Sequence, residues 1–363
     1  MKDKNTNNPE GNKTGVEAIE LLKMLISTPS LSREEEKAAD IVEAFFKNKG
    51  FSPNRKGNNI YVWAGEKDET KPTLLLNSHI DTVKPSDQWT YDPFVPTLEN
   101  GKLTGLGSND AGAPLVSLIT TFLILSQKEQ PYNLLFAASA EEEISGKNGI
   151  SSVLDEFGHI DLGIIGEPTQ MQMAVAEKGL MVLDCIAHGK QGHAAREEGV
   201  NAIYEALPDI EWFKTYRFPE ESEFLGPVKM TVTGIKAGSQ HNVVPDTCEF
   251  MVDVRINEHY SNRELYELIS ENVKCDVKAR SFRLNSSGIP VNHPVVQRGI
   301  NLGLPYYGSP TTSDQAVMNF TTLKIGPGDS ARSHTADEYV YLHEIEKGIE
   351  TYVKLLDNLQ LIR

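Results

Sequence analysis

Acidic residues and histidines stand at a few positions that directly follow predicted strands or lie in a glycine-rich loop. They are His79 and Asp81, Asp110, the run Glu141–Glu143, Glu167 and His334. Imidazole and carboxylate groups are the donors with which proteins bind zinc, cobalt and manganese. A pair of such ions needs one bridging carboxylate, and a hydrolytic site also needs a carboxylate that stays off the metal and acts as a base towards water. The spacing of these residues therefore predicts a site for two divalent ions.

The same residues have simpler interpretations when they are taken one at a time. A single acid after a strand is more often a helix N-cap or a solvated loop residue, and three glutamates in a row usually form an exposed face. Several such residues at predicted strand ends are harder to obtain by accident. The pair His79 and Asp81 also fits a ligand and its orienting group, because a ligating imidazole usually donates its other N–H to a carboxylate.

The elements that must position these residues begin with short, unbroken apolar runs. The runs cover residues 74–76, 134–137 and 162–165, with a helix-length apolar segment at 113–125. Such runs separated by helices are typical of parallel strands covered on both faces, and the ends of parallel strands converge on a crevice. Further helices are expected after the capping-box spacing of Ser32 and Glu35 and at 343–359. We therefore expect an α/β domain with a central, mostly parallel sheet.

The pattern changes after Glu177. Alternating strands are expected at 180–187, 228–232 and 249–255, with helices at 200–214 and 262–273. Alternation indicates strands with one solvent-exposed face. We therefore predict a smaller α+β domain at 178–287, inserted into a catalytic domain formed by 16–177 and 288–363, after a disordered polar tail at 1–15.

Composition bears on partners and compartment. The chain has 363 residues and a formal net charge of −16, which would repel nucleic acid and anionic membranes, so neither is an expected partner. No apolar run is expected to span a bilayer, and the first 15 residues lack the apolar stretch of a secretory signal. The cysteines Cys185, Cys248 and Cys275 form no Cys-x-x-Cys pair. Reduced thiols in a cytoplasmic protein are the simplest interpretation.

Several motifs follow one another in a familiar order. They are SHIDTV at 78–83, GLGSNDAGA at 105–113, the three glutamates, IIGEPT at 164–169 and the late His334. In these motifs the chain resembles the zinc-dependent acylase and exopeptidase family, which includes acetylornithine deacetylase and succinyl-diaminopimelate desuccinylase. The resemblance covers nearly the whole chain after the tail. It implies a dizinc exopeptidase-like catalytic domain and an inserted ferredoxin-like lid that also carries the dimer interface.

The resemblance implies a role for each candidate ligand. His79 and Glu167 would share one zinc, Glu143 and His334 would share the other, and Asp110 would bridge the two. Cobalt or manganese could substitute for zinc. Asp81 would orient His79.

The acid run can be aligned with the family in two ways. Relatives usually have Asp-Glu-Glu, and matching Glu141 to the leading acid makes Glu142 the general base and Glu143 a ligand. A shift by one residue would make Glu141 the base. Both alignments remain open at the level of sequence.

The lid also carries residues that match family positions. His193 matches a histidine that reaches the active site of the partner subunit and stabilises the oxyanion, although the residues alone would favour a surface or core histidine. The segment after it lacks the proline common in relatives. Asn242 and Arg255 match positions that contact the substrate. Arg255 could bind a carboxylate through two hydrogen bonds or form an ordinary salt bridge.

Loops near the expected pocket complete the comparison. Gly326 and the segment 312–314 resemble loops that line it on the catalytic side. Lys178 stands where desuccinylases tend to have arginine, which favours acetylated substrates.

The function that the resemblance implies is hydrolysis of the amide bond of a small N-acyl amino acid by a homodimer. Acetylornithine deacetylation in arginine biosynthesis is the first expectation, with acetylcitrulline or a succinylated amino acid as alternatives. A dipeptidase or carboxypeptidase would share the metal residues. The inserted domain argues against a lidless aminopeptidase. A non-catalytic binding protein on this fold would be expected to lack a ligand or the base, and neither is missing.

Overall fold

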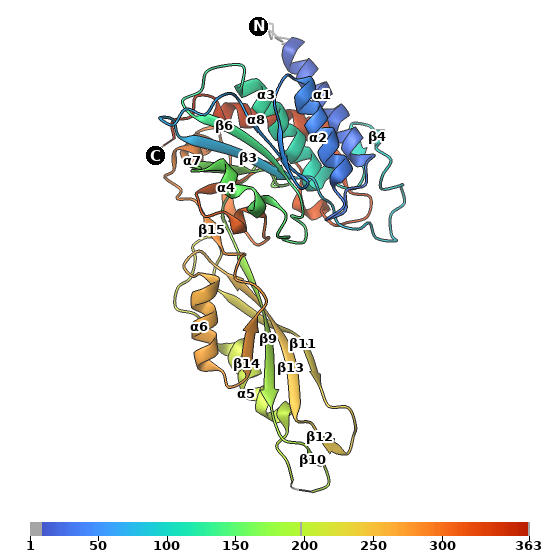
Figure 1. Cartoon of the computed structure of the whole chain (residues 1–363), viewed down its shortest axis with the longest axis vertical. Helices are drawn as coiled ribbons and strands as arrows, with labels where there is room; N and C mark the ends of the chain where they lie inside the picture. The colour runs from blue at the N-terminus through green and yellow to red at the C-terminus, as the bar shows by residue number, and fades with distance from the viewer. Residues whose placement is uncertain (1–8, 197, 362–363) are drawn as a thin grey trace. The chain divides into compact units, whose positions relative to one another are not determined.

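The computed structural model describes residues 9–196 and 198–361, with the backbone alone for residues 9–14. The chain divides into two compact units. The first unit contains the residues up to 175, residues 289–307 and the residues from 313 onwards. The second unit contains residues 176–288 and 308–312. Figure 1 shows both units and labels many of their helices and strands.

A mostly parallel sheet forms the centre of the first unit, in the order β1-β2-β6-β3-β7-β17-β8. Its strands are β1 (Asn54–Lys56), β2 (Asn59–Trp63), β3 (Thr73–His79), β6 (Asn133–Ser139), β7 (Leu162–Ile165), β8 (Met173–Glu177) and β17 (Thr322–Lys324). The four strands β6, β3, β7 and β17 are parallel to one another, while β2 and β8 run antiparallel at the two sides. The predicted sheet is confirmed, and the four parallel strands end at the same edge.

Helices cover both faces of this sheet, which explains the unbroken apolar runs. The helices are α1 (Pro9–Ile26), α2 (Glu36–Asn48), α3 (Ala113–Leu125), α4 (Leu154–Phe157), α7 (Pro294–Asn301) and α8 (Leu342–Leu356), with short turns η2 (Ile150–Ser152) and η3 (Asp314–Val317). On the face below α2 and α3, the rings of Phe46, Phe122 and Phe136 pack within 6.2 Å of one another. On the other face, Leu75 packs with Phe157 in a second cluster. Each residue of β3 and β6 is buried.

Two details at the N-terminal side correct the sequence predictions. Helix α1 begins at Pro9, so residues 9–15 of the predicted tail are helical, and residues 1–8 lie outside the described residues. Proline suits the first turn of a helix, where its missing N–H is not needed. The predicted capping box does not form, because Ser32 and Glu35 lie before α2 and bond to other segments.

Helix α3 also corrects the expectation about apolar runs. Residues Ser108–Leu125 are long and apolar enough to cross a membrane, but 83% of this stretch is buried inside the structure. The central helix of a soluble protein passes the same test, so the stretch is weak evidence for a membrane span.

A small antiparallel sheet joins two segments that carry candidate ligands. It consists of β4 (Thr97–Glu99), β5 (Lys102–Thr104) and β18 (Tyr339–Tyr341), with β5 in the middle. Strand β5 leads into the loop of Asp110, and β18 follows the segment of His334 and the turn η4 (Ser330–Arg332). Because Tyr339 pairs with Thr104, these two segments enter the same region of the first unit.

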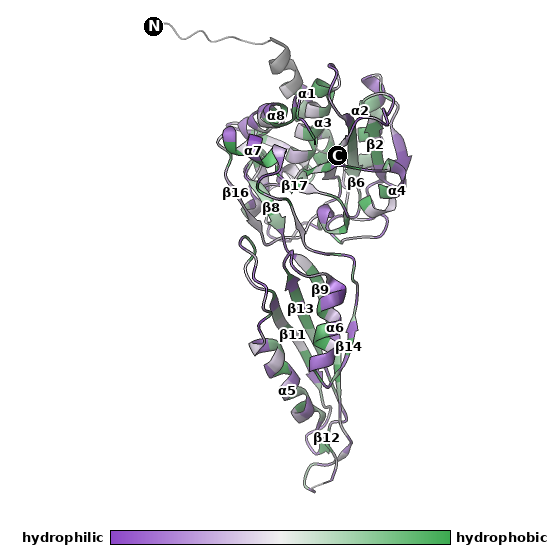
Figure 2. Cartoon of the chain, turned by 90° about the vertical axis from the view of Figure 1, so that its left-hand side faces the viewer, coloured by the Kyte–Doolittle hydropathy of each residue, from purple (hydrophilic) through white to green (hydrophobic). Residues whose placement is uncertain are grey.

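The second unit has the ferredoxin-like βαββαβ arrangement, as predicted. Its elements are β9 (Gly179–His188), α5 (Ala202–Thr215), β11 (Lys229–Ala237), β13 (Thr247–Ile256), α6 (Asn262–Asn272) and β14 (Asp276–Ala279), with short strands β10 (Gly192–His193), β12 (Val243–Val244) and β15 (Ser287–Gly288). The antiparallel sheet order is β11-β13-β9-β14. Alternate residues of β9 and β13 are buried against α5 and α6. Figure 2 colours the residues of these strands by hydropathy.

The bounds of the second unit differ from the predicted 178–287. It begins at Ala176 and also includes residues 308–312, which sequence assigned to the catalytic domain. The reason is local packing: the Lys178 N–H donates to the carbonyl of Ser309 at 3.2 Å. These residues follow strand β16 (Tyr306–Ser309).

Candidate metal centre

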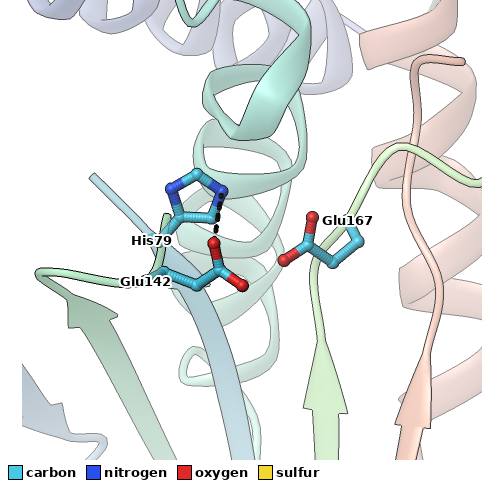
Figure 3. A group of neighbouring side chains, drawn as sticks. All are labelled: His79, Glu142 and Glu167. Carbon is cyan, nitrogen blue, oxygen red and sulfur yellow. Dashed lines mark ion pairs between the residues drawn. The ribbon is translucent and has the colours of Figure 1, made fainter. Parts of the chain in front are cut away.

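The ends of three neighbouring parallel strands bring the predicted ligands together. Strand β3 ends at His79, β6 leads into the acid run, and β7 leads to Glu167. Strand β3 pairs with both β6 and β7, so the three carboxyl ends lie side by side. Figure 3 shows His79, Glu142 and Glu167 directed towards one another from these ends.

His79 lies at the centre of two groups of donor atoms. In one group, ligand atoms of His79, Glu142 and Glu167 lie within 4.8 Å of one another. In the other, ligand atoms of His79, Asp110 and Glu143 meet the same limit. The His79 side chain is 1% exposed, and its Nε2 lies 4.0 Å from Oε2 of Glu142. A buried imidazole among carboxylates at these distances is a suitable ligand set for a divalent ion.

Asp110 stands between the two histidines. Its Oδ1 lies 3.2 Å from Nε2 of His79, and its Oδ2 lies 3.7 Å from Nε2 of His334. His334 also contacts Oε2 of Glu143 through Nε2, at 2.9 Å. The two oxygens of one carboxylate therefore face two different imidazoles, which is the arrangement that a bridging ligand needs.

The charge balance of the cluster favours cations. Burial and the neighbouring charges of Glu167, Asp314 and Glu143 raise the pKa of Glu142 well above its usual range, although His79 opposes this. Burial and the charge of Asp110 likewise raise the pKa of Glu167 to about 8. Several carboxylates are thus held together out of water, where their mutual repulsion is costly. The donor types, their spacing and this crowding of acidic groups fit one or two divalent ions.

The neighbouring acids raise the pKa of both histidines in the cluster. Burial alone would lower the pKa of His79, but hydrogen bonds to Asp110 and Asp81 raise it well above its usual range. The hydrogen bond to Glu143 raises the pKa of His334 to about 9. Metal ions would compete with protons for these same atoms.

The acid run does not present three equivalent side chains. Glu141 has a left-handed backbone (φ 54°) and is buried, and its carboxylate accepts hydrogen bonds from the side chain and the backbone N–H of Asn148, at 2.8 and 3.3 Å. Glu142 and Glu143 lie among the histidines instead. This arrangement supports the alignment in which Glu142 is the base and Glu143 a ligand.

Asp81 makes contacts that sequence did not predict. Its carboxylate accepts hydrogen bonds from the backbone N–H groups of Glu142 and Glu143, at 3.0 and 3.1 Å, and from the Ser32 hydroxyl at 2.7 Å. Nδ1 of His79 lies 2.9 Å from the backbone carbonyl of Asp81 and 3.5 Å from its carboxylate. Asp81 therefore adjoins His79 as expected, but it also fixes the backbone of the acid run.

A further buried acid lies close to the cluster. Asp314 begins η3 and accepts a hydrogen bond from the Ser139 hydroxyl at the end of β6. The side chain of Asn77 in turn donates to the oxygen of Ser139, at 3.0 Å. Burial raises the pKa of Asp314 to about 6. Sequence pointed only to the loop 312–314, because a contact between η3 and a strand end has no local signal.

Gly326 packs against the segment that carries Glu167. Its N–H donates to the hydroxyl of Thr169 at 3.0 Å, and its carbonyl accepts from the N–H of Met171 at 2.8 Å. A Cβ atom at this position would lie 2.5 Å from the carbonyl oxygen of Glu167. The structure gives Gly326 a packing role, and its predicted contact with substrate stays a prediction.

The predicted lid residues form two pairs at opposite ends of the second unit. Lys178 and Arg255 lie where β9 begins, since Arg255 pairs with Leu180. His193 and Asn242 are exposed at the other end, where the N–H of Ala194 donates to the carbonyl of Asn242. Strand β9 has 10 residues. At 3.2–3.4 Å per residue, the two pairs are roughly 30 Å apart.

Lys178 and Arg255 belong to a cluster of positive charge. Lys229, which sequence analysis missed, begins β11 and pairs with Arg255. Burial and the charges of Lys229 and Arg255 lower the pKa of Lys178. Arg255 binds both oxygens of Asp253, at 2.9 and 3.1 Å, so of its two predicted interactions the salt bridge is the one present.

Comparison with known proteins gives the same class of enzyme as the site. The model of peptidase family M20/M25/M40 matches residues 75–358. The chain is 29% identical to an acetylornithine deacetylase of Proteus mirabilis, covering 94% of this chain and 96% of that protein. It is 25% identical to a succinyl-diaminopimelate desuccinylase of Wolbachia pipientis, covering 94% and 93%. The Bacillus subtilis YXEP protein, described as a dinuclear metal-binding peptidase of family M20, shares the fold with a TM-score of 0.72 at 14% identity, covering 95% of this chain and 98% of that one.

The fold and the cluster of donors at the strand ends define a metal-binding hydrolase of amide bonds. The family match covers most of the chain, and the chain belongs to peptidase family M20/M25/M40.

Proposed function

We propose that this enzyme hydrolyses the amide bond of a small N-acyl amino acid, with acetylornithine as the first candidate substrate and arginine biosynthesis in the cytoplasm as its setting. The observation that carries the proposal is the position of Asp110: its two carboxylate oxygens face His79 and His334. Glu142 lies beside His79. The deacetylase and desuccinylase names of the relatives support an acylated amino acid.

The chain would hold two zinc ions through five side chains. They are His79, Asp110, Glu143, Glu167 and His334. When bound, the ions would lower the pKa of an attacking water and polarise the acyl carbonyl. The role of the protein is to hold five donors of the right types at the end of a rigid sheet.

Glu142 is the proposed general base. Its side chain is 12% exposed. Its backbone N–H and that of Glu143 both donate to the carboxylate of Asp81, which fixes the segment that carries the base. A carboxylate held in this way can take a proton from the attacking water and deliver it to the leaving amine. The raised pKa of Glu142 reflects burial first, and nearby cations would lower it.

The positive cluster of Lys178, Lys229 and Arg255 supports an anionic substrate. A free amino-acid carboxylate would balance these positive charges, since burial and then the nearby charges of Lys229 and Arg255 lower the pKa of Lys178. A dipeptide also carries such a carboxylate, so a dipeptidase or carboxypeptidase activity is the second candidate. The lysine at 178 favours an acetyl over a succinyl group.

We also propose that the active form is a homodimer joined through the second units. Strand β11 is an edge strand, and Ile235 on it is 59% exposed. On α5, Tyr204 and Leu207 are 68% and 52% exposed. Exposed apolar side chains beside an open sheet edge are typical of an interface between subunits.

The length of the second unit supports a shared active site. His193 lies one strand length from Lys178, roughly 30 Å away, which is more than one small substrate spans. One copy of the second unit therefore would not supply both residues to one substrate. A partner chain could supply His193, whose imidazole would then donate to the oxyanion.

A substrate screen tests the proposed activity. Purified protein with Zn²⁺ or Co²⁺ should release the free amine from acetylornithine faster than from acetylcitrulline, succinyl-ornithine, succinyl-diaminopimelate or a set of dipeptides. Amine release is measured directly. A higher kcat/KM for dipeptides would replace the deacetylase proposal by the peptidase alternative.

Metal content tests the ligand set. The parent chain should carry two ions, and His334→Ala should retain roughly half of that content, because His334 serves only one of the proposed sites. Elemental analysis after dialysis gives the ratio. An unchanged metal content in His334→Ala would remove this histidine from the centre. His159→Ala is a control, since His159 is an exposed histidine of the same unit that pairs with Asp161.

A further inference from the structure

Glu338 is a buried acid that lies outside the proposed ligand set. It is 2% exposed and directly precedes β18. Its carboxylate accepts three backbone hydrogen bonds, from Gly107 at 3.1 Å, Asn109 at 2.8 Å and Asp110 at 2.8 Å. All three N–H groups belong to the loop that presents Asp110.

The position of Glu338 is electrostatically unfavourable by itself. Burial and the adjacent charge of Asp110 raise the pKa of Glu338 to about 8, and the three N–H groups act in the opposite direction. A buried carboxylate near another carboxylate is costly unless hydrogen bonds compensate for lost water. Aligned backbone N–H groups provide such compensation, and here they can do so only while the Asp110 loop keeps this conformation.

The segment that carries Glu338 is itself fixed on several sides. His334 precedes Glu338 by four positions in the same segment. Arg332 binds both oxygens of Glu344 on α8, at 2.7 and 3.1 Å. Asp337 accepts hydrogen bonds from the N–H and the hydroxyl of Thr90, at 2.8 and 2.6 Å. Glu338 is thus attached to a firmly held segment.

A second connection links the same two segments. The side chain of Asn109 accepts from the N–H of Asp329 at 2.9 Å and donates to its carbonyl at 3.1 Å. Together with Glu338, it cross-links the Asp110 loop to the segment that leads to His334. Across the two segments that this cross-link joins, Oδ2 of Asp110 lies 3.7 Å from Nε2 of His334.

We propose that Glu338 is a positioning residue that holds Asp110 at the correct distance from His334 and thereby sets the affinity of the ion that these two side chains share. This inference rests on the proposed two-ion centre. Groups that orient metal ligands typically change metal affinity by about 10- to 100-fold when they are replaced. A residue that serves stability alone would instead lower the unfolding temperature and leave the metal affinity unchanged.

Glu338→Gln is the informative substitution. The glutamine oxygen can still accept from Asn109 and Asp110, but its amide nitrogen cannot accept from Gly107 and would direct N–H groups towards another N–H. Glu338→Asp keeps the charge on a side chain shorter by one methylene. Asp337→Asn is the matched control, because it weakens a neighbouring attachment of the same segment, to Thr90, and leaves the Asp110 loop untouched.

The experiment is a Zn²⁺ titration of the metal-free full-length proteins against a chromophoric chelator, with Co²⁺ absorption spectra and thermal unfolding of the metal-free forms. Glu338→Gln should raise the Kd of the ion that Asp110 and His334 share about 10- to 100-fold and alter the Co²⁺ spectrum, while Asp337→Asn stays near the parent. Glu338→Asp should fall between the two.

An unchanged Kd in Glu338→Gln, with a lowered unfolding temperature, would overturn the inference and leave a structural role. If Glu338→Gln does not fold, Glu338→Asp decides in the same way, since unchanged affinity would again contradict the proposal. A parent protein that binds fewer than two ions would refute the proposed metal centre, which is a separate and distinguishable result.

Discussion

Replacement of Glu142 by glutamine should lower kcat by about 10²- to 10⁴-fold while both ions stay bound. The amide cannot accept a proton from water, and Glu142 is not among the proposed ligands. Steady-state kinetics and elemental analysis on the same preparation measure the two effects. The matched control is Glu141→Gln, one residue away, whose side chain bonds to Asn148 instead of facing the histidines.

The two substitutions also decide between the alignments of the acid run. If Glu141→Gln loses activity and retains its metals, Glu141 is the general base and the alignment is shifted by one residue. Loss of metal in Glu142→Gln would instead show that Glu142 is a ligand. This is the main alternative, because ligand atoms of Glu142, His79 and Glu167 lie within 4.8 Å of one another.

Replacement of His193 by alanine should lower kcat by about 10²- to 10³-fold, with metal content unchanged, because one donor to the oxyanion is lost. His188→Ala is the control, since His188 is an exposed histidine of the same unit that pairs with Asp276. Its kcat should stay near that of the parent. Kinetics with saturating substrate separates the effect on turnover from an effect on binding.

A mixing experiment tests whether His193 acts across the dimer. Chains with His193→Ala are combined with chains that carry Glu142→Gln, and subunits are allowed to exchange. If His193 acts in the partner's site, each mixed dimer has one site with both residues intact, and activity returns. Mixed dimers detected by a mass tag but lacking activity would show that His193 acts in its own chain or not at all.

The parts of this protein that sequence predicts are those with a local signal. Unbroken apolar runs located β3, β6 and β7, and the residues that follow them met at one edge because parallel strands end together. The alternating pattern of β9 and β13 likewise located the second unit.

The contacts that sequence missed join distant segments through backbone groups. Asp81 binds the N–H groups of the acid run, and Glu338 binds those of the Asp110 loop, which lies more than 200 positions earlier in the chain. Almost every residue carries a backbone N–H, so the sequence does not indicate which of these groups a distant carboxylate will bind. The capping-box spacing at Ser32 misled for a different reason: its hydroxyl bonds to the side chain of Asp81, which is distant in sequence, and not to the backbone of the following helix.

The order of strands in the first unit has a consequence for synthesis of the chain. Strand β17 lies between β7 and β8, although the whole second unit separates it from both in sequence. A growing chain emerges from the ribosome at about 5–20 residues per second, so roughly 7 to 30 seconds pass after synthesis of β7 and β8 before their common neighbour is made. During that interval β7 exposes an unpaired edge, and His334 has not yet been made. The proposed metal centre would therefore be complete only after His334 has been translated, so metal loading would follow synthesis of the whole second unit.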